Sequence, residues 1–184
     1  MVRAAVLMVC MCILVPLLGG CSSLPAPADA ATAAALHEEC VATIADFQTR
    51  FPATGPLVVS AHAYAVFPDV DGGAFGLGGA YGRAEVYEHG QMTGYADVTQ
   101  ATIGAQVGGQ SYAEIIFFED EGALAQFKAG LWAPDARATV VAEAGGTGTA
   151  ADYRNGTAVF VVPQFGLMAQ ASVGGQRFRY QPKP

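Results

Sequence analysis

The acids and histidines are the residues of this chain whose chemistry is most evident. Asp69-Val70-Asp71-Gly72-Gly73 opens like a calcium loop, but the third oxygen ligand and the glutamate at position twelve are missing. Glu119-Asp120-Glu121 could supply catalytic carboxylates, although acids at the start of a helix are more simply explained by capping and the helix dipole. His37, His62 and His89 lack the spacing of metal ligands. We therefore expect no catalytic residue, no metal, no cofactor and no enzyme activity; a hydrolase, which is the alternative, would need acids or histidines that converge in a pocket.

A glycine-rich run over residues 76–82 contains a variant of the dinucleotide-binding fingerprint. That fingerprint needs a helix directly after it, because the N-terminus of the helix holds the pyrophosphate. The residues that follow here, among them Tyr81, Val86 and Tyr87, are typical of a strand. We predict that these glycines serve the fold, and no Gly-Lys-Ser/Thr sequence for a phosphate loop occurs.

Cys21 ends an apolar segment in a way that indicates lipid attachment. Residues 4–18 are apolar, and Leu17-Leu18-Gly19-Gly20-Cys21 resembles the lipobox of bacterial lipoproteins. Cleavage before Cys21 would remove residues 1–20 as a signal peptide and leave a cysteine that carries acyl chains such as palmitate. Ser22 in place of aspartate favours the outer membrane, with the protein facing the periplasm, and residues 21–32 predict an extended, lipidated tether. An uncleaved N-terminal membrane anchor is the alternative.

The remaining cysteine has no partner within the chain. Cys10 and Cys12 would leave with the signal peptide and Cys21 would carry lipid, so that only Cys40 remains. Cys40 lies at helical spacing among apolar residues. We predict that it is buried as a small hydrophobic side chain, and a disulfide between two chains is the alternative.

The charge of the chain limits the classes of molecule that it is expected to bind. Nine basic and 16 acidic residues give a formal net charge of −7, and loss of Arg3 with the signal peptide would make it −8. No basic run is longer than Arg177-Phe178-Arg179, so nucleic acid is not expected as a partner. Arg177, Arg179 and Lys183 form the one basic cluster and are the candidates for contact with a lipid headgroup. Three solvated charges at the C-terminus are the alternative.

The periodicity predicts one substantial N-terminal helix and one short helix that lies within a larger β region. An apolar stripe at spacings of three and four predicts an amphipathic N-terminal helix over residues 31–51, and a further helical turn is expected over residues 57–63. Asp120 is a suitable N-cap for one short helix that ends near Gly130. The stripe consists of Leu36, Cys40, Ile44, Phe47 and Phe51.

Strand-like segments fill most of the remaining chain. Turns are expected at His89-Gly90 and Gly174-Gly175, and a loop over residues 145–151. The even positions of residues 74–86 are nearly all glycine or alanine, so another strand or helix should pack tightly over that face. The sequence predicts a mainly β (α+β) domain, a compact antiparallel β sandwich or barrel-like domain over residues 33–184. The expected strands are residues 64–67, 74–87, 91–107, 112–118, 138–142, 157–162, 166–173 and 176–180.

An ordered set of short segments resembles the SYLF family, which is known for lipid-binding domains. No segment is specific alone, but their order and spacing match over roughly residues 33–181. The segments are Ala65-Val66-Phe67-Pro68, residues 72–82, Thr93-Gly94-Tyr95, residues 103–112, residues 117–127 and Gly166-Leu167-Met168-Ala169.

The resemblance implies a compact, mostly β fold and non-enzymatic lipid binding. Eukaryotic members bind phosphoinositides through a basic N-terminal helix, but Glu38, Glu39 and Asp46 outnumber Arg50 here, so that specificity is not carried over. We expect a membrane-anchored envelope lipoprotein whose domain binds lipid or another apolar ligand. A structural or protein-interaction module that lipid merely tethers to the envelope is the alternative.

Overall fold

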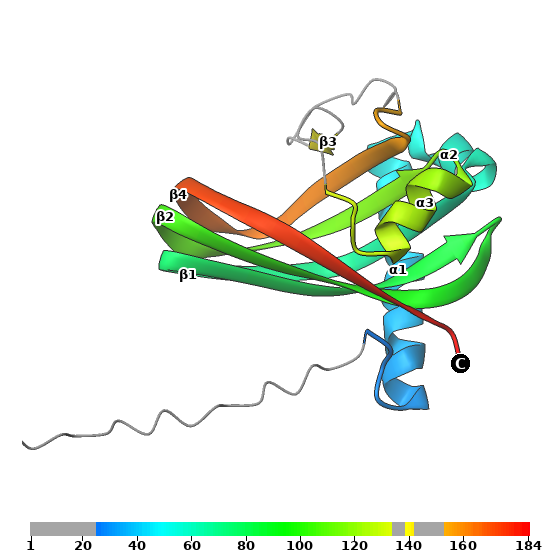
Figure 1. The fold of residues 1–184 in the computed structure, drawn as a ribbon, viewed down its shortest axis with the longest axis horizontal. Coiled ribbons are helices and arrows are strands. Elements are labelled where there is room, and N and C mark those ends of the chain that lie inside the picture. Colours follow the sequence, from blue (N-terminus) through cyan, green and yellow to red (C-terminus); the bar gives the residue numbers. More distant parts are fainter. Residues whose placement is uncertain (1–24, 134–138, 142–152) are drawn as a thin grey trace, which may run out of the picture.

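The computed structural model describes residues 25–133, 139–141 and 153–184 (Figure 1). Its sheet has the order β1-β2-β4-β3, and of the described pairs only β3–β4 is parallel. The predicted mainly β, α+β class is therefore confirmed. The predicted signal peptide, Cys21 and the loop over residues 145–151 lie outside the described residues. The elements are α1 (Ala30–Arg50), α2 (Thr54–Ser60), β1 (Ala63–Glu88), β2 (Gln91–Phe118), α3 (Glu121–Lys128), β3 (Thr139–Val141) and β4 (Thr157–Pro182).

The three main strands are longer and less interrupted than predicted. β1, β2 and β4 contain 26, 28 and 26 residues, so the ends expected at Pro68 and Gly108-Gly109 and the turn expected at Gly174-Gly175 are wrong. Pro68 is tolerated because β1 is an edge strand, and the pairing with β2 shifts register just there. The turn at His89-Gly90 is confirmed, with positive φ at both residues as a tight hairpin requires.

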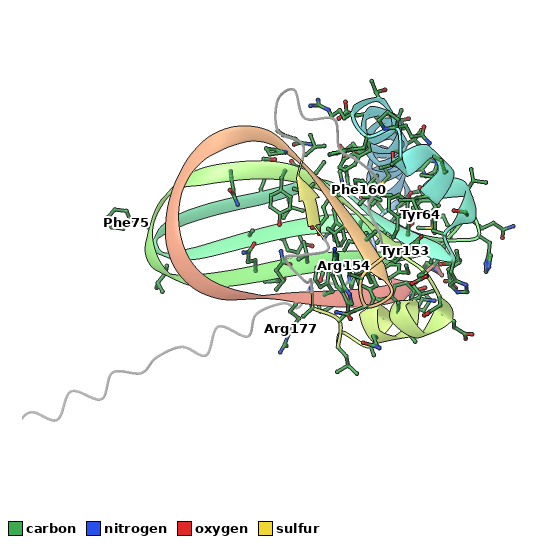
Figure 2. The ribbon with its side chains drawn as sticks, turned by 90° about the horizontal axis from the view of Figure 1, so that it is seen from above. Tyr64, Phe75, Tyr153, Arg154, Phe160 and Arg177 are labelled. Atoms are coloured by element: carbon green, nitrogen blue, oxygen red, sulfur yellow. The ribbon has the colours of Figure 1, made fainter. Side chains whose placement is uncertain are left out.

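The three strands form one ribbon that bends back on itself (Figure 2). The bend separates a first layer (residues 63–72, 110–118 and 157–164) from a second layer (residues 80–88, 91–100 and 175–182). Glycines occur near the bend in all three strands, and glycine within a strand often marks a tight bend. A glycine-rich sequence is thus compatible with a curved strand as well as with a turn. This explains why strand ends were wrongly predicted at Gly108-Gly109 and Gly174-Gly175.

The bend brings the two halves of β1 side by side. The backbone N–H of His89 donates to the carbonyl of His62 at 3.2 Å. A Cβ added to Gly82 would lie 2.7 Å from the carbonyl oxygen of Asp69 and 2.7 Å from Cγ2 of Val70. The tight packing predicted over the small-residue face is therefore confirmed, and the segment that covers it is the first half of the same strand.

Apolar side chains gather in two clusters, one between the layers and one under α1. Between the layers, Phe67 of the first and Phe178 of the second meet with ring centroids 5.9 Å apart, and α3 and Trp132 close one side. On the outer face, α1 covers the seam between the two halves of β1, where Tyr64 stacks on Tyr87 at 4.9 Å.

Aspartate side chains cap the first turns of α1 and α3. The carboxylate of Asp29 accepts from the backbone N–H of Thr32 at 2.8 Å and caps α1, and Asp120 caps α3 in the same way through Ala123. The N-terminal helix and the Asp120 cap are thus confirmed. Two short helices are present rather than the single one predicted, because the helical turn expected over residues 57–63 is a complete helix, α2, that begins earlier, at Thr54, and ends at Ser60.

The folded part of the chain begins earlier than predicted. Pro25 is buried, and the backbone N–H of Ala26 donates to Oε1 of Gln181 at 3.2 Å. Residues 30–32 already belong to α1. The tether predicted for residues 21–32 is therefore too long at its C-terminal end, because Asp29 starts the helix directly after the docked segment.

Candidate lipid-facing surface

Three arginines lie on the outer face of the second layer, because the side chains of successive strand residues point to alternate faces. Strand residues two apart share a face, and the register aligns Arg83 with Asp97 and Asp97 with Arg179. We call this surface the arginine face. It comprises Tyr81 and Arg83 of β1, Asp97 and Thr99 of β2, and Arg177, Arg179 and Gln181 of β4.

Arg179 and Asp97 form a two-armed ion pair on this face. Nε of Arg179 donates to Oδ1 of Asp97 at 2.9 Å, and a terminal nitrogen of the same guanidinium donates to Oδ2. The Asp97 side chain is fully buried, and its hydrogen bonds raise the pKa of Arg179. Removal of Arg179 alone would leave the buried charge of Asp97 uncompensated, and the two-armed geometry fixes the orientation of the Arg179 guanidinium.

Arg177 is the more accessible of the two predicted arginines. It is exposed and lines a shallow hollow of about 620 Å³ together with Arg179. Lys183 is exposed beyond the end of β4, where its backbone N–H donates to the carbonyl of Thr93 at 2.8 Å. The structure therefore places Arg177 and Arg179 together and leaves Lys183 outside their hollow. The other residues of the hollow are Thr99, Ala101, Gly175 and Gln176.

The bend carries exposed apolar side chains that the sequence did not mark as functional. Phe75 is 87% exposed and Leu77 is 69% exposed. Figure 2 shows Phe75 projecting from the ribbon at the outermost point of the bend. We call these two residues the bend tip. Leu77 shares its strand parity with Tyr81 and Arg83, so the bend tip continues the line of the arginine face.

A cluster of polar groups lies buried under α1. Glu85 accepts from the hydroxyl of Tyr87 at 2.5 Å and forms a hydrogen bond of 2.9 Å with Nδ1 of His37. Cys40 is fully buried, as predicted, and its thiol donates to the carbonyl of Val66 at 3.5 Å. Burial raises the pKa of this thiol to about 12, so it stays protonated and is a poor nucleophile. Sequence spacing gives no signal of this cluster, because it joins α1 to the distant end of β1.

A second polar group, Glu114, lies between the layers. The residue is 3% exposed, and burial raises its pKa to about 7. Gln176 of the opposite layer forms a hydrogen bond with the hydroxyl of Tyr112, whose pKa is raised by burial and then by the carboxylate of Glu114. Among the described residues, Oε2 of Glu114 and Oε1 of Gln176 are buried without a hydrogen-bond partner. The interior therefore favours a neutral Glu114.

The structure gives no sign of a metal, calcium or dinucleotide site at the other sequence motifs that it describes. Within the part of the chain that the structure describes, no three histidine, cysteine or acidic side chains are grouped so that they could hold a metal ion. Residues 69–73 and 76–82 are continuous strand, so neither a calcium loop nor a helix for pyrophosphate follows there. Over the same described ranges, no helix is long and apolar enough to cross a bilayer.

Comparison with known proteins gives no match: no family model and no curated protein matches this chain.

Proposed function

We propose that this chain is a non-catalytic, lipid-anchored lipoprotein of the cell envelope, with a SYLF-like domain that binds lipid through its arginine face. In this proposal residues 1–20 are the signal peptide, Cys21 carries the lipid, and the protein faces the periplasm from the outer membrane. The lipobox-like sequence at Leu17-Leu18-Gly19-Gly20-Cys21 supports the anchor.

The position of the first folded residues is the observation that carries the proposal. Ala26 is bonded to Gln181, which belongs to the arginine face. Cys21 precedes Pro25 by four residues, and four residues span at most about 14 Å when fully extended. A lipid on Cys21 would therefore hold this side of the domain next to the bilayer.

The charges on the arginine face support contact with an anionic headgroup despite the acidic net charge of −7. Asp97 is buried and paired, and Glu85, two residues beyond Arg83, is covered by α1. Arg83 shares a hollow of about 200 Å³ with Asp69 and Glu39, which offset its charge. Arg177 is therefore the side chain that we expect to contribute most, at about 1 kcal/mol near an anionic surface.

The buried polar groups support a non-catalytic role. Cys40 is protonated and inaccessible, and Glu85 is enclosed by Tyr87 and His37. A nucleophile needs an activating base and access to substrate, and this cluster offers neither to a molecule outside the protein.

Vesicle flotation of the unlipidated mature chain tests the proposal. A Cys21→Ser chain without residues 1–20 should float with phosphatidylglycerol-containing vesicles, and Arg177→Gln should weaken binding roughly fivefold, the equivalent of about 1 kcal/mol. Arg154→Gln is the matched control, because Arg154 is exposed ahead of β4 and lies off the arginine face. Failure to float with any envelope lipid, together with cross-linking to one envelope protein, would favour the tethered interaction module.

A further inference from the structure

We infer that the bend tip, Phe75 with Leu77, inserts into the boundary between headgroups and acyl chains of the bilayer on which the domain rests. This inference rests on the proposed function and adds an apolar contact and an orientation to it. The occupant of the bend tip is thus a lipid bilayer, and no other region of the described surface offers the same combination of exposed apolar groups and alignment with the arginine face.

The exposure of the bend tip is unusual for this protein. Among the phenylalanines whose side chains the structure describes, Phe75 alone is exposed and the other eight are buried. Six large apolar side chains are exposed in all of the described residues, and three of them lie close together on β1. These three are Phe75, Leu77 and Tyr81.

The neighbours of the bend tip along β1 add little side-chain bulk. Gly72, Gly73, Gly78 and Gly79 flank Phe75 and Leu77, and glycine has no side chain to hold these two residues away from a surface that they approach. β1 is also an edge strand, whose unpaired backbone groups would be costly to place in hydrocarbon. Insertion should therefore stop at the interfacial depth of roughly 5–10 Å that apolar faces of membrane-surface proteins reach.

The bend tip and the start of the folded chain lie at the two ends of one face. The register aligns Leu77 with Ile103 and Ile103 with Val173, which is eight residues before Gln181 on β4. Eight strand residues span about 27 Å. A lipid near Pro25 and an inserted bend tip would hold the domain at two points, with the exposed Arg177 between those points.

A bilayer fits this surface better than a second copy of the chain. A stable protein interface buries about 800 Å² on each partner, whereas the side chains of Phe75 and Leu77 together supply only a few hundred. A bilayer needs no complementary surface, and the gain from burying large apolar side chains adds to the headgroup contact of Arg177.

Depth-dependent quenching tests the insertion in the lipidated, full mature protein. We would compare Phe75→Trp with Val59→Trp, because Val59 is also 87% exposed but lies on α2. The native Trp132 is buried and supplies a constant background. In phosphatidylethanolamine–phosphatidylglycerol vesicles with brominated acyl chains, tryptophan at position 75 should be quenched and shifted to the blue, and tryptophan at position 59 should be neither.

A partition assay separates failure of the insertion from failure of the proposed function. With the Cys21→Ser chain, Phe75→Ser should reduce vesicle partitioning roughly 10- to 100-fold, the range expected for losing burial of one large apolar side chain, and Val59→Ser should leave it unchanged. Unquenched tryptophan at position 75 overturns the insertion; if the unlipidated chain still floats, the proposed function stands. A dimer that Phe75→Ser dissociates would also overturn the insertion, in favour of a second copy.

Discussion

Replacement of Glu114 by glutamine should change how the stability of this protein depends on pH. Glu114 lies between the layers of the folded ribbon, and burial raises its pKa from an ordinary 4.5 to about 7. In the unfolded chain the carboxyl is in water and titrates near its ordinary pKa. Glutamine has nearly the same shape and cannot ionise, so the Glu114→Gln variant removes the titration with little change in packing.

The sign of the effect follows from where the proton is held. Between pH 4.5 and about 7 the folded protein keeps a proton on Glu114 that the unfolded chain has released. Glu114 therefore lowers the free energy of unfolding progressively as pH rises through this window, and the loss is complete above it. At about 1.4 kcal/mol for each pKa unit, the total is about 3 kcal/mol.

Urea unfolding followed by Trp132 fluorescence measures this effect, because Trp132 packs against Phe178 in the core between the layers. The two proteins should unfold with similar free energies at about pH 4.5, and Glu114→Gln should be more stable by about 3 kcal/mol at about pH 8. Glu38→Gln, on the exposed face of α1, is the matched control. A stability difference between Glu114→Gln and the natural protein that stays constant over this range would refute the argument.

Two further predictions concern packing and the cysteine. Gly82→Ala should lower the free energy of unfolding by about 1–3 kcal/mol, because its Cβ would lie 2.7 Å from atoms of Asp69 and Val70; Gly175→Ala, with no atom within 4 Å, should be nearly neutral. Equal effects of these two substitutions in urea titrations would contradict the close approach of the two halves of β1. Cys40 should not react with a thiol reagent near neutral pH until the protein is unfolded, because burial raises the pKa of its thiol to about 12. Rapid labelling of the folded protein would show that α1 does not protect it.

The parts of the fold that depend on local chemistry could be predicted from the sequence. The apolar stripe of α1, the burial of Cys40, the Asp120 cap and the turn at His89-Gly90 each involve residues close together in the chain. The continuity of β1, β2 and β4 could not be predicted, because glycine occurs both in turns that end a strand and in bends within a continuous strand. Only the hydrogen-bonded pairing of all three strands shows which of the two a given glycine forms.

In the candidate site, too, some residues could be predicted from the sequence and others could not. Arg177 and Arg179 were predicted from their types and spacing, but the partner of Arg179 is Asp97, and this pairing depends on the register of β2 against β4. The bend tip was missed because Phe75 has the alternation of an ordinary strand residue, and its exposure follows from the curvature of the ribbon. Burial of Glu114 has the same origin, since the second layer covers it.

The contact between Ala26 and Gln181 joins residues that are 155 positions apart. A chain that crosses a membrane N-terminus first presents Ala26 long before β4 has arrived, and contacts of such large sequence separation form late in folding. If the chain is exported as the proposed function requires, the segment that follows Cys21 therefore has no docking surface until synthesis and export are nearly complete. On the proposed function, this order keeps the cysteine accessible to the enzymes that attach lipid for most of the time that the chain is in transit, and the completed fold then draws the anchored end against the domain.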